Sequence, residues 1–148
     1  MNQEYKTLLA AVDSSEESFQ ALKKGFELAK ENDAKLIISH VVDTRITSSL
    51  EQYDDAAFLR AKKYGEELLE NYKEKAINSG INNVETVLEY GTPKVKIPTE
   101  IARKHEADVI IVGATGINAA QRIFLGSVSE NIARRADCDV LIVRKSTD

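Results

Sequence analysis

Five apolar segments, separated by helical patterns, recur along the 148 residues of this chain and constrain its fold more than any other feature. They cover residues 5–12, 34–42, 84–90, 107–114 and 139–144, and each has the length of a β-strand. All but the third are nearly continuous in apolar residues, as in strands that helices cover on both faces. The third alternates apolar and polar residues, which favours a place at a sheet edge.

The first two segments between these strands carry the apolar spacing of helices. Ser14 and Glu17 predict a capping box at the start of a helix over 15–31, and Gly80 is a suitable C′ residue for a helix over 53–78. The apolar faces comprise Phe19, Leu22, Phe26 and Ala29 in the first helix, and Ala57, Ala61, Tyr64, Leu68 and Tyr72 in the second. The charges of the second helix are expected on its solvated face.

The two later helices are less regular in sequence. Pro93 could begin a helix, but Pro98 would then interrupt its first turns, so we expect a helix over about 98–105 after an irregular lead-in. Ser127 and Glu130 predict a second capping box. The apolar residues expected on the helix after it are Val128, Ile132 and Ala133.

This alternation of strands and helices predicts one α/β domain over residues 1–148, a three-layer α/β/α sandwich around a parallel sheet. In such sheets ligands bind beyond the carboxyl ends of the strands, where the winding direction reverses. If the first strand neighbours the fourth, that crevice receives the loops at 12–15 and 113–116.

Composition narrows the classes of partner. The net charge is −4, with 20 basic and 24 acidic residues mixed along the chain, and no basic run suggests nucleic acid. No apolar run reaches membrane-spanning length, and the polar N-terminus lacks a signal-peptide core, which favours the cytoplasm. Cys138 is the only cysteine, so an internal disulfide is impossible and a cysteine-based zinc site is not expected.

Three of the chain's 7 glycines lie between the fourth strand and the last helix. Gly113, Gly116 and Gly126 are followed by Ser127, and two and nine residues separate successive glycines. Glycine permits positive φ and close approach of a ligand to the backbone, and a helix N-terminus offers unpaired amides to phosphate. The set predicts a phosphate-binding loop. Turn glycines followed by a serine cap are the alternative.

Other polar side chains suggest how a ligand could be held there. Ser129 could add a hydroxyl, and Arg122 is the only cation in the loop. Asp13, which follows the first strand, suits a ribose hydroxyl or Mg²⁺ at one remove, because a bare carboxylate repels phosphate. A turn or cap role is its alternative. Neither G-x-x-x-x-G-K-[ST] nor a G-x-G-x-x-G after the first strand is present.

With these motifs, the sequence resembles the universal stress protein family over residues 5–144. The ATP-binding branch of that family carries G-x2-G-x9-G-[ST], which the three glycines and Ser127 fit without a gap. The segments "AAVDSSEES", "HVVD" and "LGSVSENIARRADCDVLIVR" are also similar to the family. The resemblance implies an adenine nucleotide alpha-hydrolase-like fold, whose five-stranded parallel sheet, in the order 3-2-1-4-5, binds ATP at its carboxyl edge.

The resemblance also implies roles for individual residues around ATP, with Mg²⁺ bound through the phosphates and no metal ligand from the protein. Those expected near the adenosine are Ala11, Val12, Asp13 and Val41. Those expected around the ribose and phosphates are Val112, Gly113, Thr115 and Gly116, and those expected on the phosphates are Gly126, Ser127, Val128 and Ser129. Ala114-Thr115 stands where the family often has Ser-Arg or Ser-His, which puts one side-chain contact in question.

The last strand is expected to form a homodimer interface through Val140, Leu141, Ile142 and Val143. The family suggests a dimer, and local chemistry agrees. An edge strand that is apolar on both faces invites pairing with a second copy. The alternative is that residues 145–148 shield the edge.

These inferences favour an ATP-binding, nucleotide-dependent regulatory dimer of the stress-response type, without catalytic residues. His40 reads as a packed residue, His105 as a helix C-terminal cation, and Cys138 as a small core residue. A weak Mg²⁺-dependent ATP hydrolase or phosphotransferase is the main alternative. A phospho-acceptor receiver domain would need an aspartate after the third strand, where "LEYGT" stands. A scaffold that has lost its ligand is the last alternative.

Overall fold

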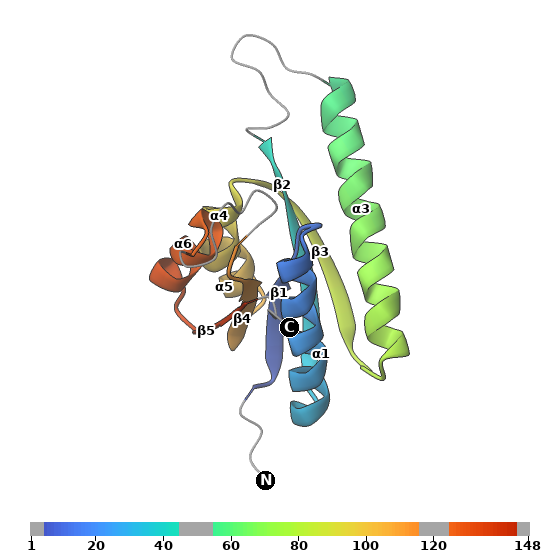
Figure 1. The fold of residues 1–148 in the computed structure, drawn as a ribbon, viewed down its shortest axis with the longest axis vertical. Helices are drawn as coiled ribbons and strands as arrows, with labels where there is room; N and C mark the ends of the chain where they lie inside the picture. Colours follow the sequence, from blue (N-terminus) through green and yellow to red (C-terminus); the bar gives the residue numbers. More distant parts are fainter. Residues whose placement is uncertain (1–4, 45–54, 116–124, 145–148) are drawn as a thin grey trace.

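The computed structural model describes residues 5–44, 55–115 and 125–144, which form one parallel sheet between two layers of helices (Figure 1). The sheet has 5 strands in the order β3-β2-β1-β4-β5. The strands are β1 (Thr7–Ala11), β2 (Lys35–Asp43), β3 (Val84–Gly91), β4 (Val109–Gly113) and β5 (Asp139–Val143). Every predicted strand, the parallel pairing and the strand order are confirmed.

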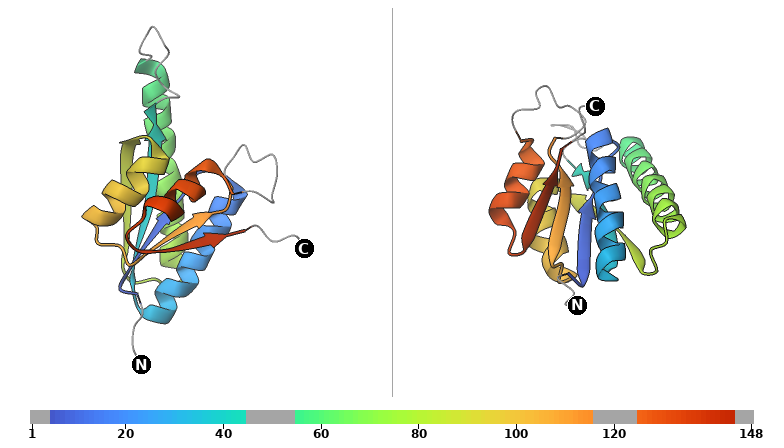
Figure 2. Two further views of the ribbon diagram at one scale, coloured as in Figure 1. Left: turned by 90° about the vertical axis from the view of Figure 1, so that its left-hand side faces the viewer. Right: turned by 60° about the horizontal axis from the view of Figure 1, so that its bottom comes forward.

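The helices are divided between the two faces of the sheet (Figure 2). One face carries α1 (Glu16–Asn32) and α3 (Asp55–Asn78). The other carries α4 (Pro93–Lys96), a π-helical turn η1 (Ile97–Ile101), α5 (Ala102–Lys104) and α6 (Ser127–Arg135). This is the three-layer arrangement that the alternation of strands and helices predicts.

Successive side chains of the central strands point to opposite faces of the sheet and so pack into two separate cores. In β1, Leu8 and Ala10 pack with residues of α1 and α3, whereas Leu9 and Ala11 pack with Ile101 and Ile132 of the opposite layer. All of these residues are buried. The continuous apolar runs of β1, β2 and β4 therefore follow from their central position, since both of their faces are covered.

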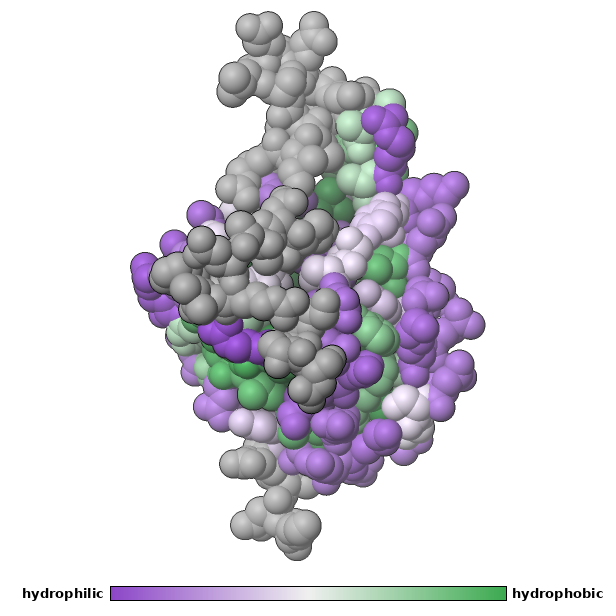
Figure 3. Space-filling view, in the orientation of Figure 1, coloured by the Kyte–Doolittle hydropathy of each residue, from purple (hydrophilic) through white to green (hydrophobic). Residues whose placement is uncertain are grey.

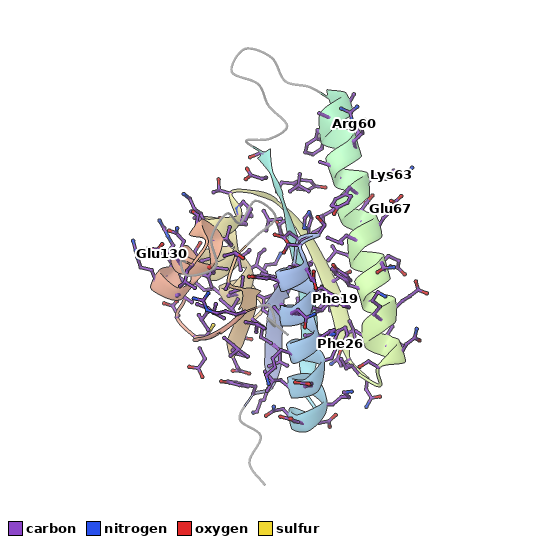
Figure 4. All side chains as sticks on the ribbon, in the orientation of Figure 1. Phe19, Phe26, Arg60, Lys63, Glu67 and Glu130 are labelled. Carbon is purple, nitrogen blue, oxygen red and sulfur yellow. The ribbon has the colours of Figure 1, made fainter. Side chains whose placement is uncertain are left out.

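The α1–α3 layer confirms the apolar face predicted for α1. Phe19 and Phe26 lie on the side of α1 that faces α3 (Figure 4), and the Phe19 ring stacks on Tyr72 with 5.6 Å between centroids. The face predicted for α3 is partly wrong, because Tyr64 is 46% exposed. The residues of α3 that are buried are Gly65, Leu69, Tyr72 and Ala76. The charged residues labelled on α3 in Figure 4, Arg60, Lys63 and Glu67, are exposed as expected.

The segment between β3 and β4 corrects the prediction that its helix begins at Pro98. The helix begins at Pro93, where a proline costs no hydrogen bond. Pro98 lies inside η1, where the backbone widens into a π turn. A π turn relieves the clash and the missing donor that a proline imposes on a regular helix. The Pro98 side chain is buried, so packing favours this geometry.

The last two elements complete the sheet. In α6, Ile132 is buried and Val128 is partly buried, but Ala133 is exposed, contrary to the prediction. In β5, Val140 and Ile142 pack against one core, and Leu141 and Val143 against the other. The strand is thus apolar on both faces although it lies at an edge, and Figure 3 shows hydrophobic side chains gathered where Figure 1 draws β5.

Candidate functional site

The winding direction of the sheet reverses between β1 and β4, which are paired directly. β1 ends at Ala11 and β4 at Gly113, and the loops that follow leave from the same edge of the sheet. The N-terminus of α6 is tied to this edge because the Gly126 amide donates to the Ala114 carbonyl at 2.7 Å. The Asp13 loop, the end of β4 and the start of α6 therefore lie at the edge of the sheet where the ligand crevice is predicted.

The Asp13 loop is a turn with internal hydrogen bonds. Asp13 Oδ1 accepts from the Ser15 amide at 2.7 Å, and the Ser18 hydroxyl accepts from the Asp13 amide at 2.8 Å. The α1 cap is Ser15, whose hydroxyl accepts from the Ser18 amide, so the prediction of a Ser14 cap is wrong by one residue. The turn role weighed for Asp13 is confirmed for Oδ1, and Oδ2 has no hydrogen bond among the described residues.

Glu17 does not complete a capping box. With the cap at Ser15, Glu17 lies at the second helical position and its side chain turns towards the end of β4. Its Oε2 accepts from the Thr115 amide at 2.8 Å and from the Thr115 hydroxyl at 2.6 Å. Both residues are buried, at 9% and 7% exposure. These bonds join the first turn of α1 to the loop after β4.

Gly113 is required by this contact and not by positive φ. Among the described glycines, only Gly80 and Gly91 have positive φ. A Cβ at Gly113 would lie 2.9 Å from the Glu17 carbonyl carbon and 3.0 Å from the Ser18 amide nitrogen. The positive φ that glycine permits is therefore not used at Gly113. The absence of a side chain lets α1 pack on the end of β4.

The N-terminus of α6 presents amides that have no partner among the described residues. Gly126 is the cap residue and makes no side-chain cap, and the Glu130 amide bonds back to the Gly126 carbonyl. The amides of Ser127, Val128 and Ser129 are left over, as for any helix start. Within the described ranges no side chain caps them. Uncapped amides at the positive end of a helix are the arrangement that anions generally favour, and α6, nine residues long, has three such amides among the described residues.

The second predicted capping box is wrong as well. Ser127 is the first helical residue, not the cap, and its side chain is exposed. Glu130 points away from the start of α6 (Figure 4) and pairs with Arg134 at 2.7 Å. Ser129 is buried, and its hydroxyl donates to the Ala114 carbonyl at 2.7 Å. The Ser129 hydroxyl thus holds the start of α6 to the end of β4. Of the polar groups of Ser129, only the backbone amide is then a candidate for ligand contact.

The apolar site residues predicted on or directly after β1, β2 and β4 divide between the faces of the sheet. Ala11, Val41 and Val112 belong to the core below α4–α6, where Ile97 is also buried. Val12 belongs to the opposite core, and its amide and carbonyl bond to the Ser39 carbonyl and to His40. Three of the four apolar residues therefore share the face on which α6 lies.

The surroundings of His40, Cys138 and Tyr72 indicate structural roles for these side chains. His40 Nδ1 donates to the Val12 carbonyl at 2.9 Å, as expected for a packed, bonded histidine. Burial, and then the neighbouring Asp139, raises the pKa of Cys138, which favours the protonated thiol over the nucleophilic thiolate. Burial, and then Tyr64 and Asp13, raises the pKa of Tyr72.

Two of the predicted site residues, Gly116 and Arg122, lie outside the described residues. In the ranges that are described, no three histidine, cysteine, aspartate or glutamate side chains come together as a metal site. No helix in those ranges is long and apolar enough to cross a membrane.

Three residues of the site escaped the sequence analysis. Glu17 was interpreted as part of a cap, the Ala114 carbonyl accepts bonds from Gly126 and Ser129, and Ile97 is buried in the same core as Val41. A backbone carbonyl leaves no trace in sequence. The sequence shows an acid at Glu17, and a carboxylate in the first turn of a helix can either complete the cap or bond to another segment. Which of these roles it takes depends on the residue that caps the helix.

Comparisons with known proteins point to one family. The model described as the universal stress protein family matches residues 4–144. A Staphylococcus epidermidis protein that carries the name of that family is 50% identical over 140 residues, which cover 95% of this chain and 84% of the relative.

Solved structures point the same way. A hypothetical protein, solved to assign its biochemical function from its structure, is 28% identical with a TM-score of 0.86, covering 98% of this chain and 99% of its own. A universal stress protein solved in complex with cAMP is 29% identical with a TM-score of 0.69, covering 96% of this chain and 98% of its own. The fold is thus shared over nearly the whole chain.

Proposed function

This chain belongs to the universal stress protein family, and from that premise we propose that it binds ATP at the β1–β4 crevice and acts as a nucleotide-dependent regulatory dimer. The observation that carries the proposal is the uncapped start of α6, where the amides of Ser127, Val128 and Ser129 have no protein partner among the described residues. A phosphate chain is the ligand that such amides fit best.

The other residues of the crevice fit the remaining parts of a nucleotide. Asp13 keeps one carboxylate oxygen for a ribose hydroxyl, while its Oδ1 fixes the turn. Ala11 and Val41, predicted near the adenosine, and Val112, predicted around the ribose and phosphates, lie on the face of the sheet that carries α6. A relative that is 29% identical was solved with cAMP, which supports an adenine nucleotide as the ligand class.

Mg²⁺ would bind through the phosphates and neutralise part of their charge. This helps the proposal because Asp13 and the Glu17 carboxylate both lie at this end of the sheet, where unscreened phosphate charge would be repelled. No protein ligand to the metal is needed. The cytoplasm is the compartment we propose for this activity.

Slow hydrolysis, the alternative function, has no specific support in the described residues. His40 uses Nδ1 to hold the Val12 carbonyl, and Asp13 uses Oδ1 to hold the Ser15 amide. Phosphate release measured with and without an Asp13→Ala change would distinguish an ATPase from a binding protein.

Direct binding of ATP is the first expected result. Titration calorimetry with ATP and Mg²⁺ should give saturable binding with a Kd below ~1 mM, which is a free energy stronger than about −4 kcal/mol. ADP, AMP, cAMP and GTP titrated in parallel identify the preferred base and phosphate number. Mass spectrometry of the denatured protein should detect any nucleotide that co-purifies. Absence of binding by every adenine nucleotide at millimolar concentration would refute the proposal.

The dimer is the second expected result. Sedimentation velocity should give twice the monomer mass, because β5 is an apolar edge strand and pairs only with β4 among the described residues. Val143→Lys should produce monomers. Val84→Lys, on the opposite edge strand β3, is the matched control and should leave the dimer intact, since both valines are partly buried. A dimer that survives Val143→Lys, or a monomeric unsubstituted protein, contradicts this interface.

A further inference from the structure

We propose that Glu17 is a positioning residue for the phosphate end of the nucleotide, acting through Thr115 and Ala114 on the start of α6. This inference rests on the proposed function, and it assigns a role to a buried acid that neither the glycine motif nor the predicted ligand contacts include. The chain of contacts runs from α1 to the loop after β4 and from there to α6.

The first link joins Glu17 to Thr115. One carboxylate oxygen accepts both donors of Thr115, the amide at 2.8 Å and the hydroxyl at 2.6 Å. Both donors of Thr115 are therefore already used by the protein. Thr115 was expected to wrap the ribose and phosphates, but its donors hold the loop instead, and this geometry fixes the peptide that connects Ala114 to Thr115.

The second link joins that peptide to α6. The Ala114 carbonyl belongs to the same peptide unit as the Thr115 amide, because a peptide bond is planar. It accepts from the Gly126 amide and from the Ser129 hydroxyl, both at 2.7 Å. The orientation that Glu17 imposes on one side of the peptide therefore sets the direction of the carbonyl that anchors the start of α6.

The third link joins Glu17 to the ribose side of the crevice. The first turn of α1 also contains Ser18, whose hydroxyl bonds to the amide and carbonyl of Asp13. The same helical turn thus holds the Asp13 loop and, through Glu17, the peptide that anchors α6. Its function is to set the spacing between the ribose contact and the phosphate amides.

Energetics favour a positioning role over simple packing. A buried carboxylate carries a desolvation penalty, and an apolar side chain would join a helix to a sheet without it. A carboxylate at this place is justified by directional bonds, which an apolar contact cannot supply. Gly113 adds to this constraint, because its missing side chain brings the α1 backbone into contact with β4.

Binding of ATP and of AMP to Glu17→Ala tests the inference. We expect ATP affinity to fall about tenfold, the effect of losing hydrogen bonds to a charged group. AMP affinity should fall less, since AMP has fewer phosphates to be misplaced. Glu17→Gln should lose less ATP affinity than Glu17→Ala, because its amide oxygen can still accept both donors of Thr115, in bonds that are weaker without the charge. In the Glu17→Ala background, a further Thr115→Val change should have no effect on ATP affinity.

Each outcome is decisive. Equal losses for ATP and AMP, or full ATP affinity in a folded Glu17→Ala protein, overturn the positioning role while the proposed function stands. An unsubstituted protein that binds no adenine nucleotide overturns the proposed function itself. Circular dichroism establishes folding, and if Glu17→Ala does not fold, Thr115→Val in the natural background is the substitute. That variant keeps the hydrogen bond from the amide of residue 115 to Glu17 and should lose less ATP affinity than Glu17→Ala. Its affinity for ATP should again fall more than its affinity for AMP.

Discussion

Replacing Ser127 by aspartate is expected to weaken ATP binding by about 100-fold, because like charges brought together in a binding site cost several kcal/mol and 1.4 kcal/mol is tenfold in affinity. Ser127 is the exposed first residue of α6, next to the amides that we assign to the phosphates. A carboxylate there would repel the phosphates and accept hydrogen bonds from the same amides. The measurement is titration calorimetry with ATP and Mg²⁺.

The fold should not suffer from this change. An acidic residue in the first turn interacts favourably with the helix dipole, so the free energy of unfolding should stay constant or rise slightly. This separates loss of binding from loss of structure.

Two control variants isolate the cause of this loss. Ser127→Ala removes only the hydroxyl and should reduce ATP affinity several-fold at most, since the amides remain. Ala133→Asp adds the same charge on the exposed face of α6, away from its start, and should bind ATP as the natural protein does. If Ser127→Asp binds ATP with unchanged affinity, the phosphates do not lie at the start of α6.

Gly113→Ala is expected to lower the free energy of unfolding by about 2 kcal/mol, as overpacking of a tight contact does. The new methyl would lie 2.9 Å from the Glu17 carbonyl carbon and 3.0 Å from the Glu17 carbonyl oxygen. Backbone atoms of α1 cannot move aside as a side chain can. The helix must therefore shift away from β4, which should also displace Glu17 and weaken ATP binding.

Gly25→Ala is the matched control for this effect. Its Cβ would lie 3.4 Å from the terminal methyl groups of Ile111 and Leu36, which can adjust. Alanine is also a better helix former than glycine by about 1 kcal/mol. Urea unfolding should show Gly25→Ala to be neutral or more stable than the natural protein. A Gly113→Ala protein of unchanged stability would contradict the close packing of α1 on β4.

The sheet could be predicted from sequence because every strand has its own apolar pattern, so each strand is identified independently of the others. Each buried strand is marked by its own apolar run, and the alternating pattern of residues 84–90 marked β3 as an edge strand. The apolar run of β5 gave no such mark, since both faces of this edge strand contact a core. The order of the strands came from the family resemblance and is confirmed.

The helix starts could not be predicted to the residue. Ser14 and Ser15 are equivalent in propensity, and the hydrogen bond from the Ser15 amide to Asp13 decides between them. Once the cap moves by one residue, Glu17 changes from a cap partner to an anchor for Thr115. Pro98 was misjudged because a π turn that accommodates it depends on tertiary packing, which local sequence does not encode.

The place of the candidate site stays a prediction, and several contacts that shape it could not be predicted from sequence. The glycine motif indicated the edge where β4 ends and a helix, α6, whose first amides have no side-chain cap among the described residues, and binding there stays a prediction. It did not predict the contact of Gly113 with α1, and it could not reveal that the Ser129 hydroxyl bonds to the Ala114 carbonyl. Steric roles of glycine and bonds to backbone carbonyls depend on neighbours that are distant in sequence.

The most direct test of the phosphate assignment follows backbone amides by ¹⁵N NMR while ATP and Mg²⁺ are added. The account predicts that the amide signals of Ser127, Val128 and Ser129 move on binding and saturate with the nucleotide. The Thr115 amide, which is bonded to Glu17, should move less. Saturable ATP binding that leaves the three α6 amides unmoved, with the changes located elsewhere, would contradict the account.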